Sequence, residues 1–96
     1  MSLVDHPSHY NASGRKECIV EMVEKYGFVV TATFCLMNAY KYFYRAGLKD
    51  GNYKQDVEKA IWYFKWVSER IDYNDCNGLN MELYRDIEDM IIEYTG

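Results

Sequence analysis

The sequence predicts an all-α protein: a compact bundle of about four helices with an irregular N-terminal arm. Its 96 residues are enough for one domain and too few for a second. Apolar residues recur at the three- and four-residue spacing of a helix face, and no segment alternates as a half-buried strand does. We therefore expect a single domain over residues 1–96, with the arm at 1–13 and the bundle at 15–95.

The segment 28–46 is the helix around which the others are expected to pack. Almost every residue in it is apolar or aromatic, so as a helix it is hydrophobic nearly all round, which indicates burial among other helices. Gly47 is expected to end this helix, and Lys49 belongs to the turn that follows.

Three further helices are predicted from the same periodicity. The first runs over 15–26 from an N-cap at Ser13, and only a short link at Gly27 separates it from the second helix, which favours an antiparallel hairpin. The third runs over 54–72, and the last begins after an Asn cap and ends near residue 94. The first helix is expected to bury one face, made of Cys18, Ile19, Met22, Val23 and Tyr26.

Composition and charge narrow the classes of partner. A net charge of −4 gives no basic footprint for DNA or RNA, so we expect no nucleic-acid partner. Ten Tyr, four Phe and two Trp exceed what four short helices can hide, so we expect a homo-oligomer. Trp62 and Trp66 lie largely off the inner stripe of the third helix and indicate a second apolar surface, such as a subunit contact.

The cysteines and the apolar segment 28–46 help to predict the cellular compartment of the protein. The three cysteines form no C-x-x-C pair and are expected to be reduced structural thiols. No signal peptide is recognisable, and Asn38, Lys41 and Arg45 interrupt the apolar run before it reaches bilayer length. We therefore expect a cytoplasmic protein with no membrane partner.

Polar residues on the second and third helices form the candidate site. Asn38, Lys41, Tyr42 and Arg45 recur at i, i+3, i+4 and i+7, which lines them along one helix face. Cations on such a helix need a partner, which can be a bound anion, a carboxylate of the protein, or water reached by the long side chains. The third helix adds three polar residues on a shoulder of its inner stripe: Asp56, Lys59 and Tyr63.

These residue types suit phosphate chemistry. Guanidinium forks match phosphate oxygens and ammonium groups supply mobile positive charge, which is the role we assign to Arg45, Lys41, Lys49 and Lys59. Asp56, with Glu17 as a second carboxylate, would hold a magnesium ion together with the substrate phosphates. The competing interpretation is a structural ion pair of Asp56 with Lys41 or Arg45.

The N-terminal arm adds two further candidates. His9 and Tyr10 either pack the arm on the core or contact the substrate. His6 and His9 lack the further ligands that a zinc site needs. The phosphate loop, the dinucleotide fingerprint, the G-x-S-x-G elbow and the H-E-x-x-H motif are all absent from the sequence.

Three blocks, in this order, resemble a small phage-encoded family of unknown function that includes a deoxynucleoside monophosphate kinase of a lytic coliphage. They are the residues 6–11, HPSHYN, then 38–49, NAYKYFYRAGLK, and then 56–63, DVEKAIWY. The resemblance covers about residues 5–70 and departs at Met37, where the family commonly has Gly.

The resemblance implies phosphoryl transfer from a nucleoside triphosphate to a deoxynucleoside monophosphate, in the host cytoplasm if the protein is phage-encoded. We assign Lys41, Arg45 and Asp56 to catalysis. The residues assigned to substrate and phosphate binding are His9, Tyr10, Asn38, Tyr42, Lys49, Lys59 and Tyr63.

Two other functions stay open. All-α nucleoside triphosphate pyrophosphohydrolases hold magnesium with E-x-x-E and E-x-x-D carboxylates, and Glu21 with Glu24 and Asp86 with Asp89 are loosely similar. The other alternative is a non-catalytic phage accessory protein that binds a host factor through the aromatic surface around Trp62 and Trp66.

Overall fold

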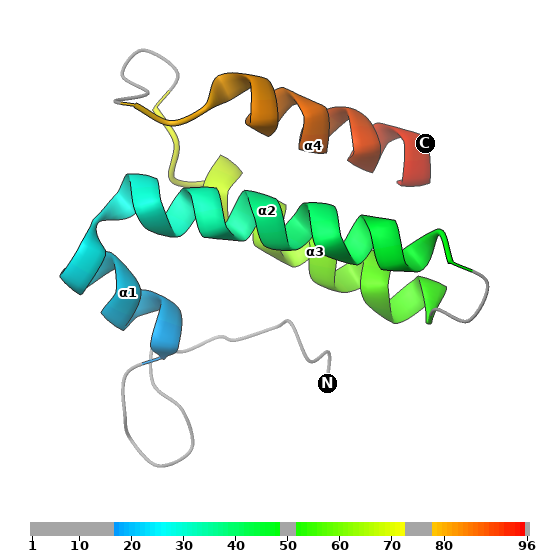
Figure 1. The fold of residues 1–96 in the computed structure, drawn as a ribbon, viewed down its shortest axis with the longest axis horizontal. Coiled ribbons are helices and arrows are strands. Elements are labelled where there is room, and N and C mark those ends of the chain that lie inside the picture. The colour runs from blue at the N-terminus through cyan, green and yellow to red at the C-terminus, as the bar shows by residue number, and fades with distance from the viewer. Residues whose placement is uncertain (1–16, 49–51, 73–77, 96) are drawn as a thin grey trace.

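The computed structural model describes residues 17–48, 52–72 and 78–95. Within these ranges the chain forms four α-helices and no strand, which confirms the all-α bundle (Figure 1). The helices are α1 (Cys18–Tyr26), α2 (Phe28–Ala46), α3 (Tyr53–Ser68) and α4 (Met81–Thr95). The predicted arm, with Ser13, His9 and Tyr10, lies outside the described residues, as does Lys49.

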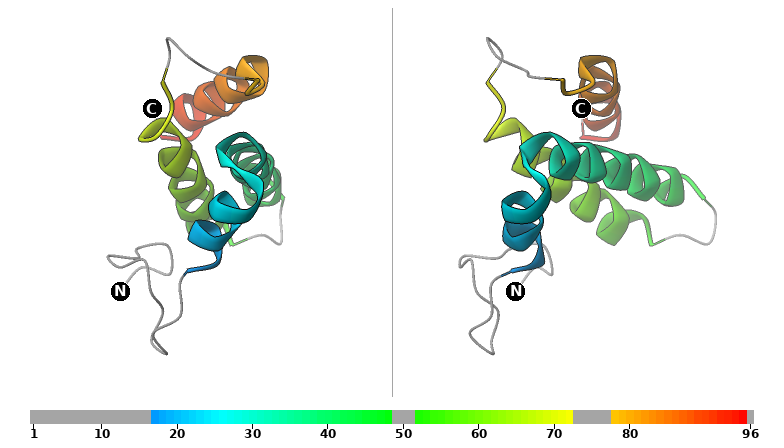
Figure 2. Two further views of the ribbon diagram at one scale, coloured as in Figure 1. Left: turned by 90° about the vertical axis from the view of Figure 1, so that its left-hand side faces the viewer. Right: turned by 60° about the vertical axis from the view of Figure 1, so that its left-hand side comes forward.

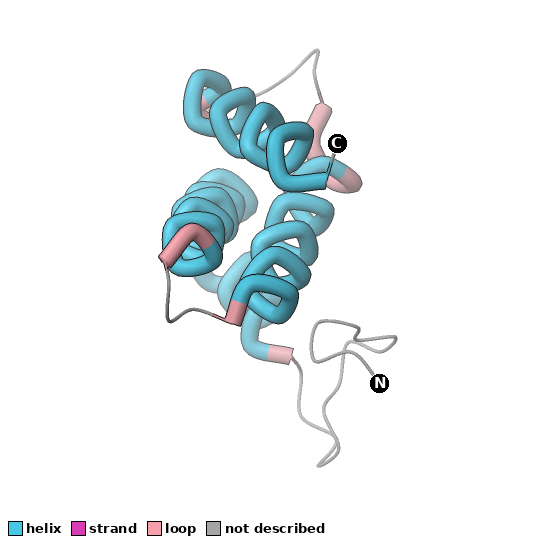
Figure 3. Tube along the Cα trace, turned by 90° about the vertical axis from the view of Figure 1, so that its right-hand side faces the viewer, coloured by secondary structure: helices cyan, strands magenta, loops and turns pink. Residues whose placement is uncertain are grey.

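The antiparallel pair of α2 and α3 forms the centre of the fold. The two helices lie side by side, and α4 packs against both of them (Figures 1 and 3). The α2 helix has the predicted bounds, because a glycine flanks the apolar run at each end. None of the described helices is both long enough and apolar enough to cross a bilayer. The core joins α2, α3, the approach to α4 and α4 itself through Ala32, Cys35, Leu36, Ala39, Phe43, Ala46, Val57, Ala60, Phe64, Trp66, Val67, Leu79, Tyr84 and Ile87.

The α4 helix is held by a cap at one end and an aromatic contact at the other. Asn80 Oδ1 accepts a hydrogen bond from the backbone N–H of Leu83 at 3.0 Å, which confirms the predicted Asn cap. Near the other end, the Tyr94 ring stacks on Phe43 with centroids 5.0 Å apart, and its hydroxyl donates to the Phe43 carbonyl at 3.3 Å. This contact fixes the C-terminal end of α4 against α2.

The α1 helix does not form the predicted antiparallel hairpin. It is steeply inclined to α2, as the two views of Figure 2 show. The link is the single residue Gly27, with φ 92°, which is too short for the loop of a few residues that reverses a helical chain. The α1 helix therefore buries no residue fully: Ile19 and Val23 pack against the core, while Cys18 and Tyr26 are exposed, contrary to prediction.

The α3 helix differs from prediction in its end and its inner face. It ends at Ser68 rather than Asp72, and Asn52 caps its start by accepting from the backbone N–H of Gln55 at 3.4 Å. Trp66 is buried and stacks on Phe28, with ring centroids 5.9 Å apart. The predicted subunit contact therefore does not apply to Trp66, because the start of α2 covers it.

The α2 helix is not enclosed on all sides, contrary to the prediction from its composition. Its buried residues lie on the side that faces α3 and α4, and large apolar side chains on the opposite side are exposed. Three partner helices of 9 to 16 residues cannot surround a helix of 19 residues.

Burial of Cys35 makes the fold sensitive to alkali. The side chain is fully buried, and this desolvation raises the pKa of the thiol from 9.0 to about 12, against a smaller lowering effect of Arg70. Above pH 9 the unfolded chain loses this proton and the folded chain keeps it, so stability falls as pH rises towards the folded pKa.

We expect the Cys35 contribution to lower the free energy of unfolding by about 1.4 kcal/mol per pH unit in this window. The measurement is urea unfolding at pH 8, 9 and 10 on the wild type and Cys35→Ala, with Cys18→Ser as control. Equal slopes for wild type and Cys35→Ala would contradict it.

Candidate functional site

The antiparallel packing of α2 and α3 brings the two predicted polar stripes together around Tyr42. The Tyr42 ring stacks on the Tyr63 ring, with centroids 6.0 Å apart and planes inclined by 10°. Asn38 lies one helical turn before Tyr42 and interacts with the Tyr63 side chain. Asn38, Tyr42 and Tyr63 are all half-buried, so this ring pair is partly accessible to solvent.

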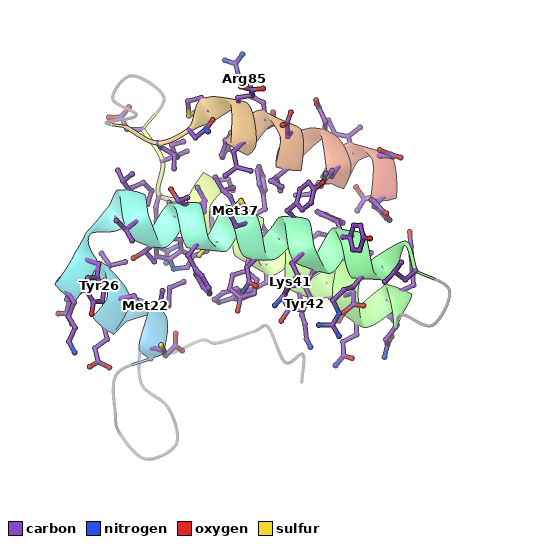
Figure 4. The ribbon with its side chains drawn as sticks, viewed as in Figure 1. Met22, Tyr26, Met37, Lys41, Tyr42 and Arg85 are labelled. Atoms are coloured by element: carbon purple, nitrogen blue, oxygen red, sulfur yellow. The ribbon has the colours of Figure 1, made fainter. Side chains whose placement is uncertain are left out.

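Three cationic side chains surround the Tyr42 ring. Lys41 Nζ lies 4.7 Å from the ring centroid, Lys59 Nζ 5.4 Å and Arg45 Cζ 5.6 Å. Figure 4 shows Lys41 and Tyr42 projecting from the same side of α2. Three positive charges gathered around one ring repel one another, so the arrangement favours an anion near them. We call Lys41, Arg45 and Lys59 the cation cluster.

No carboxylate in the described ranges forms a salt bridge with the cation cluster. Within the described ranges, the structure records an ion pair at a distance from the cluster: Lys25 Nζ lies 3.7 Å from Glu21 Oε1 on α1. The predicted alternative, in which Asp56 pairs with Lys41 or Arg45, is therefore not observed between these residues. As far as the described residues go, the charges of the cluster face solvent or a ligand.

The Tyr63 hydroxyl is a proton donor at neutral pH. Burial raises the pKa of Tyr63, and Tyr42, Cys35 and Cys18 act in the same direction, while the interaction with Asn38 opposes them. A phenol held protonated beside three cations can donate a hydrogen bond to a phosphate oxygen.

Asp56 is buried without a complete set of partners. The residue is only 3% exposed, and its Oδ2 atom has no hydrogen-bond partner within the part of the chain that the structure describes. The sequence places it on a shoulder of α3, but packing encloses it in the core, one turn before Lys59. A buried carboxylate oxygen without a donor costs stability, and such an atom calls for an explanation such as a ligand or a metal ion.

The two carboxylates predicted to hold magnesium are placed differently. Glu17 lines a cavity of about 840 Å³ between α1 and α3, and Asp56 does not line it. Across the described ranges, no three His, Cys, Asp or Glu side chains gather as a metal site. Asp56 alone suits magnesium chemistry, since Mg²⁺ is often held by one or two carboxylates with phosphates and water supplying the other ligands.

The cavity between α1 and α3 was not predicted as such. Its walls include Phe28, Trp62 and Trp66, and its rim carries Glu17, Glu24, Glu58, Lys65, Glu69 and Arg70. The Arg70 guanidinium lies 4.5 Å from the Trp66 ring centroid and donates to the Trp66 carbonyl at 2.9 Å. The sequence did contain a signal for this cavity, namely Trp62 and Trp66, which are one helical turn apart. Both side chains line the cavity, on the side of α3 that faces α1.

The structure thus groups six of the predicted site residues, from two helices. Three others, His9, Tyr10 and Lys49, lie outside the described residues. The grouped residues are Asn38, Lys41, Tyr42, Arg45, Lys59 and Tyr63.

Comparison with known proteins gives one family match. Neither the curated proteins nor the solved structures contain a significant match to this chain. The model of a family described as a protein of unknown function, DUF3310, matches residues 4–65. The match includes the whole of α1 and α2 and most of α3, and it excludes α4. Because it covers well over half of the sequence, the chain belongs to the DUF3310 family of proteins of unknown function.

Proposed function

We infer that this protein binds a nucleotide through the cation cluster and transfers a phosphoryl group from a nucleoside triphosphate to a deoxynucleoside monophosphate. The observation that carries this proposal is the convergence of Lys41, Arg45 and Lys59 on one ring, with no described carboxylate paired to them. The reaction class follows from the resemblance of residues 6–11, 38–49 and 56–63 to the phage family with a kinase member.

In this proposal the side chains act by positioning and charge neutralisation. Arg45 holds a phosphate through two parallel N–H···O bonds, and Lys41 and Lys59 neutralise further oxygens. Asn38 and the protonated Tyr63 donate hydrogen bonds that orient the substrate. Phosphoryl transfer needs little else from a protein, because its transition state is stabilised mainly by charges placed around the phosphate oxygens.

Asp56 is the candidate carboxylate for a magnesium ion. A magnesium ion held there would neutralise negative charge on the phosphates of the nucleotides. The unpartnered Oδ2 atom supports this role, because coordination would satisfy an atom that is otherwise buried without a partner. His9, Tyr10 and Lys49 keep the substrate-binding role that the resemblance implies.

The pyrophosphohydrolase alternative has weaker support. Glu21 lies on α1, exposed and paired with Lys25, whereas Asp86 and Asp89 lie on the exposed side of α4. Figure 1 shows α1 and α4 on opposite sides of the α2 and α3 pair. Carboxylates so separated do not converge on one metal ion.

Product analysis tests the proposed function. We expect the protein, incubated with a nucleoside triphosphate, a deoxynucleoside monophosphate and magnesium, to form two nucleoside diphosphates in equal amounts. Omitting magnesium should stop the reaction. Release of pyrophosphate would instead support the pyrophosphohydrolase.

A thermal-shift screen of mono-, di- and triphosphates tests binding separately from catalysis. A true ligand at a hundredfold excess over its dissociation constant stabilises the folded state by about 2.7 kcal/mol. If no nucleotide raises the melting temperature, the proposal is wrong and the non-catalytic accessory protein is favoured.

A further inference from the structure

An exposed apolar stripe runs along the length of α2. Its side chains recur at three- and four-residue spacing and are 44 to 65% exposed. Figure 4 shows Met37 on the side of α2 nearest the viewer. We call this set the α2 stripe: Val30, Phe34, Met37, Tyr40, Tyr44 and Leu48.

No described helix covers the α2 stripe as a whole; at its edge, the Phe34 ring meets the Tyr63 ring of α3 with centroids 6.1 Å apart and remains 44% exposed. In the left panel of Figure 2 and in Figure 3, α3 lies on one side of α2, and no described helix lies on the opposite side. The α2 helix contains no Asp or Glu, so the stripe carries none of the chain's excess negative charge. A continuous exposed apolar face of this length is typical of an interaction surface.

We propose that the α2 stripe is the contact between two copies of this chain, paired antiparallel about a two-fold axis at the level of Ala39. The stripe is self-complementary about that residue. Val30 and Leu48 are equally distant from Ala39 along the chain, and so are Phe34 and Tyr44. A two-fold pairing therefore sets aliphatic against aliphatic and ring against ring, as an isologous interface requires.

Lys41 fits the same symmetry. It is as far from Ala39 as Met37 is, so the pairing sets its aliphatic stem against Met37 of the second copy. Its Nζ atom lies 4.7 Å from the Tyr42 centroid, beside the stripe. The ammonium group can therefore stay outside the apolar contact while its stem extends it.

The exposed area is sufficient for a stable dimer. With about 200 Å² for a fully exposed large side chain, the six side chains present roughly 600 Å² on each copy. Two copies would bury about 1,200 Å², the lower end of the range for stable interfaces. The inference does not depend on the proposed nucleotide chemistry.

Sedimentation of three variants of the full chain tests the pairing. The variant with Phe34→Glu and Tyr44→Glu sets like charges opposite each other, and its dimer dissociation constant should rise about 100-fold or more. The variant with Phe34→Lys and Tyr44→Glu sets opposite charges together only in the antiparallel register, so it should dimerise more tightly than the first. Ile92→Glu, on an exposed residue of α4, is the control and should not change the constant.

Cysteine cross-linking tests the register without adding charge. With Cys18 and Cys76 replaced by Ser, a Val30→Cys chain mixed with a Leu48→Cys chain should form a disulfide-linked pair, and Val30→Cys alone should not. A wild type that is monomeric throughout the micromolar range would overturn the proposal. An oligomer that the double Glu variant leaves intact, or cross-linking of Val30→Cys alone, would also overturn it.

Discussion

Asp56→Asn is expected to reduce phosphoryl transfer about 100-fold or more, the usual effect of removing one electrostatic group from an active site. The fold should be slightly more stable than the wild type, because the unpartnered Oδ2 atom no longer carries charge into a buried position. The gain is about 1 kcal/mol, since losing a negative charge from the first turn of α3 offsets part of it. The measurements are turnover with magnesium and urea unfolding without nucleotide.

Asp86→Asn, an exposed residue of α4, is the matched control for Asp56→Asn and should change neither quantity. The combination of lower activity and higher stability is the signature of a group retained for function. If Asp56→Asn costs several kcal/mol of stability, Asp56 holds the fold through a partner. Unchanged turnover would exclude it from catalysis.

Arg45→Lys is expected to weaken nucleotide binding by tenfold or more, about 1.4 kcal/mol, with no change in melting temperature. The substitution keeps the positive charge near Tyr42 and removes the planar fork that holds a phosphate bidentately. Titration with the nucleotide found in the thermal-shift screen measures the effect. Arg85→Lys on α4, far from Tyr42 in Figure 4, makes the same chemical change and should leave affinity unaltered.

Arg45→Ala separates the phosphate clamp from a structural role. Arg45 is exposed and forms no salt bridge with a described carboxylate, so its loss should cost less than about 0.5 kcal/mol of stability. Nucleotide affinity should fall further than in Arg45→Lys, because the charge is lost as well. A cost of several kcal/mol together with unchanged binding would show that Arg45 supports the fold instead.

Part of the site was predictable because it lies on single helices. Asn38, Tyr42 and Arg45 share a face through the helical repeat alone, and α2 has the predicted bounds because Gly27 and Gly47 flank its apolar run. The sequence left a bound anion, a carboxylate of the protein and water open as partners of these charges. The sequence alone could not decide among these partners, because the answer depends on which side chains of α3 lie opposite the charges on α2.

The tertiary structure decided how the helices meet. The antiparallel register of α2 and α3 places Lys59 and Tyr63 beside Tyr42. Helical periodicity left Asp56 on a shoulder and Trp66 off the inner stripe, yet packing buries both of them. Periodicity records which residues share a face of one helix, whereas burial depends on contacts with helices distant in sequence. For the same reason the sequence showed that α2 is apolar nearly all round, and only the arrangement of the other three helices showed which side stays open.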